Sequence, residues 1–276
     1  MKPELTIVIV TYNVRDYLTD CLESLSDHPP ATPHEIVVVD NASNDGTVEM
    51  VRERWPRVQV IPLAENRGFS AANNVGIRAT AEHGSRLVLL LNSDTSVPEG
   101  ALDTLIDRFD AIPDVAIAGP RLVDAQGRPE LSFGPMPGPF NEARQKRLGA
   151  AYARGEARAV RRVERLTCKE HFPDWVTGAC LLVSRIDAEK AGLLDERYFM
   201  YLEDADFCAA VRALGWRVLF TPAATVVHLR GRARARANAL AERGYRRSHL
   251  AFYRKHHPGW APLLWLYLAL RGRLSG

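Results

Sequence analysis

The chain has 276 residues, of which 46% are hydrophobic and 25% are charged, and its formal net charge at pH 7 is +3. These values are typical of a globular protein with one large α/β domain or two small ones, and they exclude wholesale disorder. No apolar run reaches the roughly 18 residues that a membrane-spanning helix needs. The four cysteines lack metal-ligand spacing, so we expect reduced core thiols in a cytoplasmic protein, with no secretory leader before the first strand.

The sign of the charge differs between the two ends of the chain. Residues 230–276 hold eleven Lys or Arg and one acidic residue, Glu242, so this tail carries +11 − 1 = +10 and residues 1–229 carry +3 − 10 = −7. A segregated basic tail predicts an anionic partner, such as a membrane surface or a charged polymer, although a solvated basic helix is the alternative. Nucleic acid is disfavoured as the partner because no reader motif appears in the sequence.

Strands and helices alternate through the first third of the chain. Runs of β-branched residues predict strands that are buried on both faces, and the segments between them space apolar residues at helical intervals. Strands are predicted at 5–10, 35–39, 58–63 and 87–91, and helices at 15–26, 47–54 and 70–82. The alternation predicts an α/β fold with an open, mostly parallel sheet flanked by helices, in which ligands bind at the carboxyl ends of the strands.

The pattern loosens after Gly119, and no linker separates two independent domains. The segment Trp260–Leu270 is apolar on nearly all sides but too short to span a bilayer. It has two interpretations: a helix that packs on the domain or on a second copy, and an anchor that lies in the surface of an anionic membrane. The other predicted elements are a loop at 129–139, a basic helix at 141–165, strands at 179–183 and 217–221, a helix at 203–214 and a helical tail at 233–254.

Polar residues follow three of the predicted strands, at 11–13, 40–46 and 92–95. Asp94 comes directly after a wholly apolar strand, which would hold its carboxylate rigidly at the edge of the sheet. A carboxylate in this place suits a hard divalent cation that is also bound to substrate phosphates. The structural alternatives are an Asx-turn at Asp94 and a helix cap at Asp40.

Two further groups of polar residues precede predicted helices. Arg67 and Gly68 stand before a helix rich in small residues, an arrangement that suits a diphosphate. Glu203, Asp204 and Asp206 place three carboxylates in one first turn, where the helix dipole favours them. Apolar and aromatic neighbours raise the pKa of a carboxyl group, as a general base requires, although a structural cap is the alternative interpretation.

Seven segments in chain order resemble the family 2 inverting glycosyltransferases of GT-A fold, and within them the rhamnosyltransferase-like branch. The resemblance covers about residues 5–231. It implies a catalytic domain at 1–231, with a nucleotide-sugar half at about 1–118 and an acceptor half at 119–231, followed by a basic helical tail at 232–276. The segments are TIVIVTYN, EIVVVDNASNDGT, ENRGFSAANNVGI, LLLNSD, WVTGACLLVSR, FMYLEDADFCAAVRALGW and VVHLRG.

The resemblance also implies a role for individual residues. Asp204 is the implied base, with Glu203 as its neighbour, and Asp94 and His228 are the implied ligands of Mg²⁺ or Mn²⁺. Asn92 stands where the family's DxD motif begins with Asp, so metal binding rests on Asp94 and the phosphates; a simple loop histidine is the alternative for His228. The implied donor-nucleotide residues are Thr11, Tyr12, Asn13, Asp40, Asn41, Arg67 and Asn92, with Asp40 on the pyrimidine ring NH, and the implied sugar and acceptor pocket is Trp175, Gly178 and Ala179.

The implied reaction moves a sugar from a nucleotide diphosphate to a hydroxyl group with inversion. dTDP-rhamnose is the favoured donor, UDP and GDP sugars stay open, and a lipid-linked cell-envelope glycan is the expected acceptor, at the inner face of the membrane. One alternative is a sugar-1-phosphate nucleotidyltransferase, which is disfavoured because residues 11–15 lack a Gly-rich, Lys-containing loop. A second alternative is a non-catalytic sugar-nucleotide-binding module in which Asp204 is structural.

Overall fold

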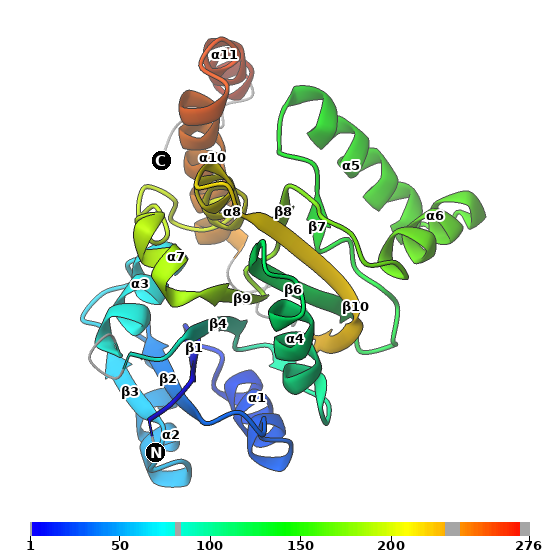
Figure 1. Ribbon diagram of the computed structural model, residues 1–276. Coiled ribbons are helices and arrows are strands. Elements are labelled where there is room, and N and C mark those ends of the chain that lie inside the picture. Colours follow the sequence, from blue (N-terminus) through cyan, green and yellow to red (C-terminus); the bar gives the residue numbers. More distant parts are fainter. Residues whose placement is uncertain (1, 81–83, 230–237, 271–276) are drawn as a thin grey trace.

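The computed structural model describes residues 2–80, 84–229 and 238–270. An eight-stranded sheet crosses the molecule in the order β3-β2-β1-β4-β9-β6-β10-β5 (Figure 1). This arrangement confirms the predicted open, mostly parallel sheet. Its strands are β1 (Leu5–Thr11), β2 (His34–Asp40), β3 (Gln59–Pro62), β4 (Leu87–Asn92), β5 (Thr95–Ser96), β6 (Val115–Val123), β9 (Cys180–Ser184) and β10 (Arg217–His228).

Helices cover both faces of the sheet because successive strand residues point to opposite sides. Ile7 and Ile9 of β1 lie in one core cluster, and Val8 and Val10 lie in another. α1 (Arg15–Asp27), α2 (Thr47–Arg54) and α4 (Ala101–Asp110) supply the first cluster. α3 (Phe69–Ala79), α7 (Arg185–Lys190) and α8 (Glu203–Ala213) supply the second.

One antiparallel strand brings the two halves of the chain together. β9 runs antiparallel between β4 and β6, whereas β1, β2, β3 and β4 are parallel. The start of β9 therefore meets the end of β4, where Asn92 N donates a hydrogen bond to Ala179 O at 2.9 Å. β10 lies parallel to β6 and ends at His228, which pairs with Thr95 of β5. Residues from three distant segments, at 92–96, 179–180 and 227–228, thus reach one edge of the sheet.

Several predicted elements need correction. α4 and β6 lie where no element is predicted, and β10 continues beyond 221 through a bulge between Thr221 and Thr225. The prediction of a single helix at 141–165 is wrong. The segment forms two helices, α5 (Pro139–Ala153) and α6 (Ala157–Thr167), which are separated at Gly155, whose φ is +73°. The predicted loop at 129–139 holds β7 (Phe133–Gly134), which pairs with β8 (Trp175–Val176). Residues 81–83 and 233–237 of the predicted helices lie outside the described residues.

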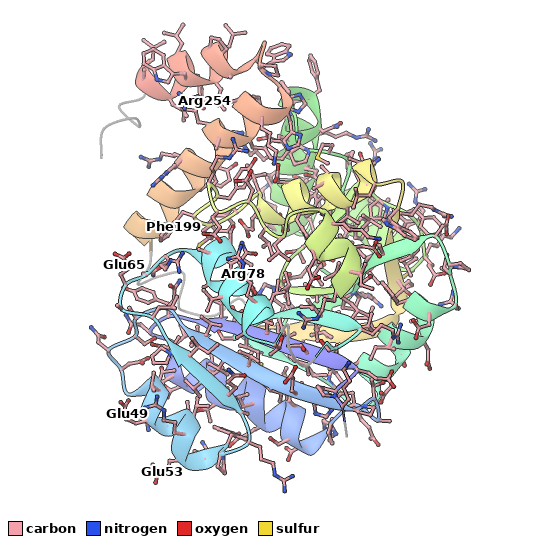
Figure 2. All side chains as sticks on the ribbon, turned by 60° about the vertical axis from the view of Figure 1, so that its left-hand side comes forward. Glu49, Glu53, Glu65, Arg78, Phe199 and Arg254 are labelled. Atoms are coloured by element: carbon pink, nitrogen blue, oxygen red, sulfur yellow. The ribbon has the colours of Figure 1, made fainter. Side chains whose placement is uncertain are left out.

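The C-terminal tail forms α10 (Asn238–His256) and α11 (Ala261–Leu270). Phe252 and Tyr253 of α10 share a core cluster with Tyr198 and Ala205, so α10 packs on the start of α8. Figure 2 shows Arg254 of α10 at one end of the molecule and Glu49 and Glu53 of α2 at the opposite end. None of the described helices is long and apolar enough to cross a membrane.

Candidate active site

The carboxyl ends of β1 and β2 hold two buried polar atoms without a hydrogen-bond partner among the described residues. Thr11 pairs in register with Asp40, and the two residues are 1% and 2% exposed. One oxygen of Asp40 accepts from Ser43 N at 2.9 Å, whereas its other oxygen and Thr11 Oγ1 have no hydrogen-bond partner among the described residues. An unsatisfied buried polar atom costs about 1–3 kcal/mol, so a ligand that binds both atoms gains this energy.

The neighbouring residues Asn13 and Tyr12 form the rim of this site. Asn13 takes a positive φ of 53° and holds the loop after β2, since its N donates to Ser43 Oγ at 2.9 Å and its Oδ1 accepts from Asn44 N at 2.8 Å. Tyr12 is 38% exposed, so its ring is accessible to a ligand. Asn13 therefore shapes the loop, and Tyr12 is the residue of the pair that is free to stack.

Asn41 organises the loop that carries Arg67. Its Oδ1 accepts from Arg67 N at 2.8 Å, and its Nδ2 donates to Asn66 Oδ1 and Gly68 O at 2.9 and 3.2 Å. These bonds occupy the amide, so Asn41 positions the loop instead of offering a free donor. The Arg67 guanidinium lies 3.6 Å from Glu196 and is 43% exposed, which leaves it accessible to an anion.

The end of β4 and the end of β10 bring the two predicted metal ligands together. His228 Nε2 lies 3.3 Å from Asp94 Oδ1 and 3.5 Å from Asn92 Nδ2. His228 Nδ1 lies 3.1 Å from Glu130 Oε2, and Glu130 is a buried residue that the sequence does not single out. Burial disfavours the imidazolium, but the hydrogen bonds to Asp94 and Glu130 outweigh it and raise the pKa of His228 to about 9.

This pair fits a divalent cation only together with substrate atoms. No group of three or more His, Cys, Asp and Glu side chains is arranged to hold a metal in the described part of the chain. Asp94 and His228 place one oxygen and one nitrogen 3.3 Å apart, and a cation that binds both would displace the proton of His228 Nε2. Mg²⁺ and Mn²⁺ commonly take one or two protein ligands and complete their shell with phosphate oxygens and water, so the donor set suits a cation bound with a diphosphate.

Asp204 lies half-buried in the first turn of α8. Its Oδ1 accepts from Ala205 N at 2.8 Å, its Oδ2 accepts from Gly178 N at 3.2 Å, and the Thr177 hydroxyl also bonds to it. Burial raises the pKa of Asp204 despite these bonds. The carboxylate is therefore both oriented and basic, which are the two properties a general base needs. The sequence does not single out Thr177.

Glu203 lies beside Asp204 but points into the protein. It is 6% exposed, and its Oε2 has no hydrogen-bond partner among the described residues. Burial and the charge of Asp204 raise the pKa of Glu203 well above its usual range. Glu203 is therefore an electrostatic neighbour of Asp204.

The segment before β9 connects the region of Asp94 and His228 to the first turn of α8. Gly178 N bonds to Asp204, and Ala179 O accepts from Asn92 N, which connects α8 to the end of β4. A Cβ at Gly178 would lie 3.3 Å from the Phe69 ring and 3.8 Å from Asp204 Cβ, so glycine leaves room beside Asp204. Trp175 donates its indole N–H to Pro135 O at 3.0 Å and packs partly into two core clusters, so it supports the wall of this region.

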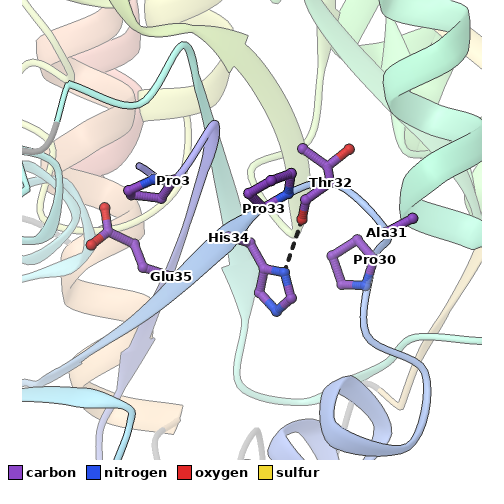
Figure 3. Close-up of a pocket in the computed structure, with 7 residues that line it drawn as sticks. All are labelled: Pro3, Pro30, Ala31, Thr32, Pro33, His34 and Glu35. Carbon is purple, nitrogen blue, oxygen red and sulfur yellow. Dashed lines mark hydrogen bonds between the residues drawn. The ribbon is translucent and has the colours of Figure 1, made fainter. Parts of the chain in front are cut away.

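A hollow elsewhere on the molecule is separate from this edge. It is lined by Pro3 and by the loop and strand residues 30–35, at the amino ends of β1 and β2 (Figure 3). The polar atoms of Thr11, Asp40, Asn92 and Asp94 follow the opposite ends of the strands. The hollow therefore does not belong to the candidate site.

The chain resembles known proteins over most of its length. A model of the family described as glycosyl transferase family 2 matches residues 6–164. The N-acetylglucosaminyl-diphospho-decaprenol L-rhamnosyltransferase of Mycobacterium tuberculosis is 32% identical over 285 residues, which span 100% of this chain and 92% of that protein. A low-salt glycan biosynthesis hexosyltransferase of Haloferax volcanii is 27% identical over 77% of this chain and 62% of its own length.

Two solved structures share the fold. The mannosyltransferase PcManGT of Pyrobaculum calidifontis, in complex with GDP-Man and Mn²⁺, has a TM-score of 0.60 at 20% identity and matches 96% of this chain and 68% of its own. TarS of S. aureus has a TM-score of 0.55 at 16% identity and matches 93% of this chain and 74% of its own. The family model covers more than half of the chain and the mycobacterial relative aligns with all of it, so the chain belongs to glycosyl transferase family 2 and is rhamnosyltransferase-like.

Proposed function

We propose that the chain is a metal-dependent, inverting rhamnosyltransferase that uses dTDP-rhamnose and a lipid-linked glycan acceptor. The observation that carries the proposal is the contact chain from Asp204 through Gly178–Ala179 to Asn92, His228 and Asp94. This connection of Asp204 to Asp94 and His228 supports the proposal that a base and a bound cation act at one edge of the sheet. The mycobacterial relative is named as an L-rhamnosyltransferase, which supports rhamnose as the sugar transferred.

The reaction needs one carboxylate. Asp204 removes the proton of the acceptor hydroxyl, whose oxygen attacks C1 of the donor sugar on the face opposite the diphosphate. The bond between C1 and the phosphate oxygen breaks, and the anomeric centre is inverted without a glycosyl–enzyme intermediate. Mg²⁺ or Mn²⁺ held by Asp94 and His228 would supply positive charge for the departing nucleoside diphosphate, and the accessible guanidinium of Arg67 would add to it.

The buried pair Thr11 and Asp40 supports a pyrimidine nucleotide. The free Asp40 oxygen is an acceptor in a buried place and therefore suits the ring N–H of thymine or uracil. Tyr12, which is 38% exposed beside this pair, would stack on the base. These contacts favour dTDP and UDP donors over donors whose base lacks a ring N–H.

The acceptor proposal rests on the relative and on the surface of the tail. The mycobacterial relative is named for an acceptor on decaprenyl diphosphate, so we expect a polyprenyl-linked sugar here. We also propose peripheral contact with the inner face of the membrane, through an apolar patch whose members are 44–80% exposed. The apolar patch consists of Phe140, Trp260, Leu263, Trp265, Leu266, Tyr267 and Leu270.

Two contacts make the apolar patch continuous. The rings of Phe140 and Trp260 meet edge to face at 6.0 Å between centroids, and His257 Nε2 lies 2.7 Å from Pro137 O. The start of α5 thus lies against the start of α11. Arg147 of α5 and Arg254 of α10 are exposed cations on two of the helices next to this patch, and they favour an anionic surface.

A donor panel tests the proposal directly. Thermal stabilisation should appear with dTDP-rhamnose in the presence of Mn²⁺ or Mg²⁺ and disappear with EDTA, because a ligand that binds the folded state stabilises it. Incubation with polyprenyl-diphosphate N-acetylglucosamine should release dTDP and give a product of inverted anomeric configuration by NMR. Binding without transfer to any polyprenyl-linked sugar would favour a binding module, and release of dTTP from diphosphate and donor would favour a nucleotidyltransferase.

A further inference from the structure

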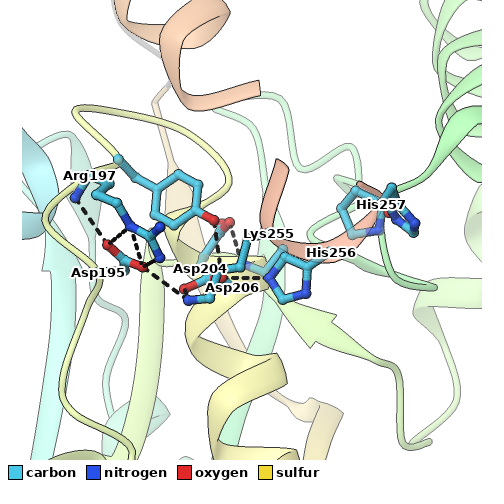
Figure 4. A network of polar contacts seen from close by, with 10 residues as sticks. Asp195, Arg197, Asp204, Asp206, Lys255, His256 and His257 are labelled. Atoms are coloured by element: carbon cyan, nitrogen blue, oxygen red, sulfur yellow. Dashed lines mark hydrogen bonds and ion pairs between the residues drawn. The ribbon is translucent and has the colours of Figure 1, made fainter. Parts of the chain in front are cut away.

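Asp206, two residues after Asp204, anchors α10 to α8 (Figure 4). Its carboxylate is 2% exposed, accepts from Tyr198 Oη at 3.1 Å and Lys255 Nζ at 2.8 Å, and lies 2.6 Å from His256 Nε2. Burial opposes the charge, but the bonds from His256 and Lys255 outweigh it and lower the pKa of Asp206. Asp206 is therefore an ionised anchor, and its partners come from the tail.

Lys255 extends this anchor to the loop that enters α8. Its Nζ also lies 3.0 Å from Asp195 Oδ2, and Asp195 in turn binds the guanidinium of Arg197. The loop ends in Tyr201 and Leu202, two successive non-glycine residues with φ of 70° and 69°. Backbone in this region persists only where surrounding contacts hold it. Asp204 comes two residues after Leu202, so its orientation depends on how firmly this loop is held.

The loop also reaches the donor side of the site. Phe199 O accepts from Phe69 N at 2.6 Å, and Tyr198 O accepts from Ser70 Oγ at 2.7 Å. Gly68 has a φ of +83°, and a Cβ there would lie 2.5 Å from Phe199 O, so the two backbones touch. Residues 195–202 therefore link three parts of the molecule: α10, Asp204 and the loop that carries Arg67 and Gly68.

α10 has a second polar anchor, whose carboxylate lies on α5 and not on α8. Glu142 of α5 accepts from Tyr253 Oη at 2.9 Å and lies 3.1 Å from His249 Nε2. Each of the two carboxylates holds α10 through two side chains, but only Asp206 connects it to the turn that bears Asp204. The chain thus provides its own control for loosening of α10.

We propose that Lys255 and His256 are positioning residues of glycosyl transfer, which hold Asp204 in its reactive orientation by binding Asp206 and the loop 195–202. The proposal rests on the proposed role of Asp204 as the base. It makes the C-terminal helix α10 part of the catalytic apparatus, beyond any role in membrane contact. Misplacement of a reacting group by about 1 Å can cost 10²-fold in rate, so loss of these contacts has a measurable effect.

The test compares kcat with KM and nucleotide affinity in full-length variants. We expect Lys255→Met and Asp206→Asn to lower kcat by about 10-fold or more, while the donor KM and the Kd for dTDP with Mn²⁺ stay within about twofold. The double variant should lose less than the product of the two single losses, because the two residues share one interaction while each keeps further partners. Lys255→Arg should recover most of the rate. Lys255 is one-third exposed, so its variants decide the question if Asp206→Asn does not fold.

Two matched variants control for general effects. Glu142→Gln loosens the other anchor of α10, and Arg254→Met removes an exposed cation next to Lys255; both should keep kcat within about twofold. A kcat of Lys255→Met equal to that of the wild type, or an equal loss in Glu142→Gln, would overturn the proposal. An active Asp204→Asn enzyme would instead remove the base assignment itself, so the two failures are distinguishable.

Discussion

At the scale of single residues, Asp204 is the most direct test of the chemistry. We expect Asp204→Asn to retain the affinity for dTDP and Mn²⁺ and to lose kcat by about 10²–10⁴-fold, the usual contribution of a general base. Because burial raises the pKa of Asp204, the acid limb of kcat/KM in the wild type should lie above the ordinary range for an aspartate. Steady-state kinetics from pH 4 to 9 measure the loss of kcat in the variant and the acid limb of kcat/KM in the wild type. Near wild-type turnover in Asp204→Asn would make Asp204 a cap; Asp103→Asn, in the first turn of α4, is the control.

Asp94 is the proposed cation ligand whose role is tested most directly. Asp94→Ala should abolish the part of dTDP affinity that requires Mn²⁺, because it leaves His228 as the only member of the 3.3 Å pair. Calorimetry with dTDP, with and without Mn²⁺, measures that part. Glu65→Ala, at an exposed carboxylate of the loop before α3, should leave it unchanged. A metal-dependent affinity that survives in Asp94→Ala would exclude Asp94 as a ligand.

Glu203 and Glu142 should affect stability in opposite directions. A carboxyl group whose folded pKa is raised, as in Glu203, costs stability that grows as pH rises above the unfolded value near 4.5. Glu203→Gln should therefore melt at a higher temperature than the wild type at pH 8, with a smaller difference at pH 5. The pKa of Glu142 is lowered, despite burial, by bonds from His249 and Tyr253, so Glu142→Gln should melt lower than the wild type at pH 8, and the difference should shrink as pH falls from 4.5 through the lowered pKa. Melting curves at these pH values test both variants. A melting temperature of Glu203→Gln below that of the wild type at pH 8 would contradict the expectation for Glu203.

At the scale of elements, the contact between the loop before α3 and the loop before α8 can be tested at Gly68. Gly68→Ala combines a positive φ with a clash against Phe199 O, whereas Gly127→Ala, at φ +75°, meets nothing within 4 Å. The control should cost about 1 kcal/mol, and Gly68→Ala should cost several times more and weaken donor binding. Chemical denaturation and nucleotide titration measure the two effects. Equal losses in both variants would mean that the clash is relieved by movement of Phe199.

The elements that could be predicted from sequence are those with a local signal. The strands and helices of residues 5–91 follow from runs such as Leu87–Leu91 and from helical spacing, and the carboxyl-edge residues Thr11, Asp40 and Asp94 follow from them. The antiparallel direction of β9 leaves no local trace, because an apolar strand reads alike in both directions. Glu130 beside His228, and Lys255 beside Asp206, depend on long-range pairing and lie in segments without a motif.

At the scale of the whole molecule, the two ends differ in charge and the tail presents the apolar patch. If the patch lies in a membrane surface, the full chain should sediment with vesicles that contain anionic phosphatidylglycerol and much less with phosphatidylcholine alone, and salt should weaken binding. Leu263→Glu with Leu266→Glu should reduce sedimentation, because these side chains are 57% and 49% exposed and would carry charge into the lipid interface.

Ile186→Glu is the matched control for membrane binding. Ile186 lies on α7 and is 61% exposed, outside the apolar patch, so its replacement should leave sedimentation unchanged. Light scattering on the same proteins separates lipid contact from self-association: a dimer of the wild type that becomes a monomer in the Leu263 and Leu266 variant, without vesicle binding by either, would assign the patch to a second copy. Vesicle binding that disappears in this variant while kcat on a short-chain, water-soluble acceptor stays unchanged would show that α11 serves the membrane and α10 the reaction.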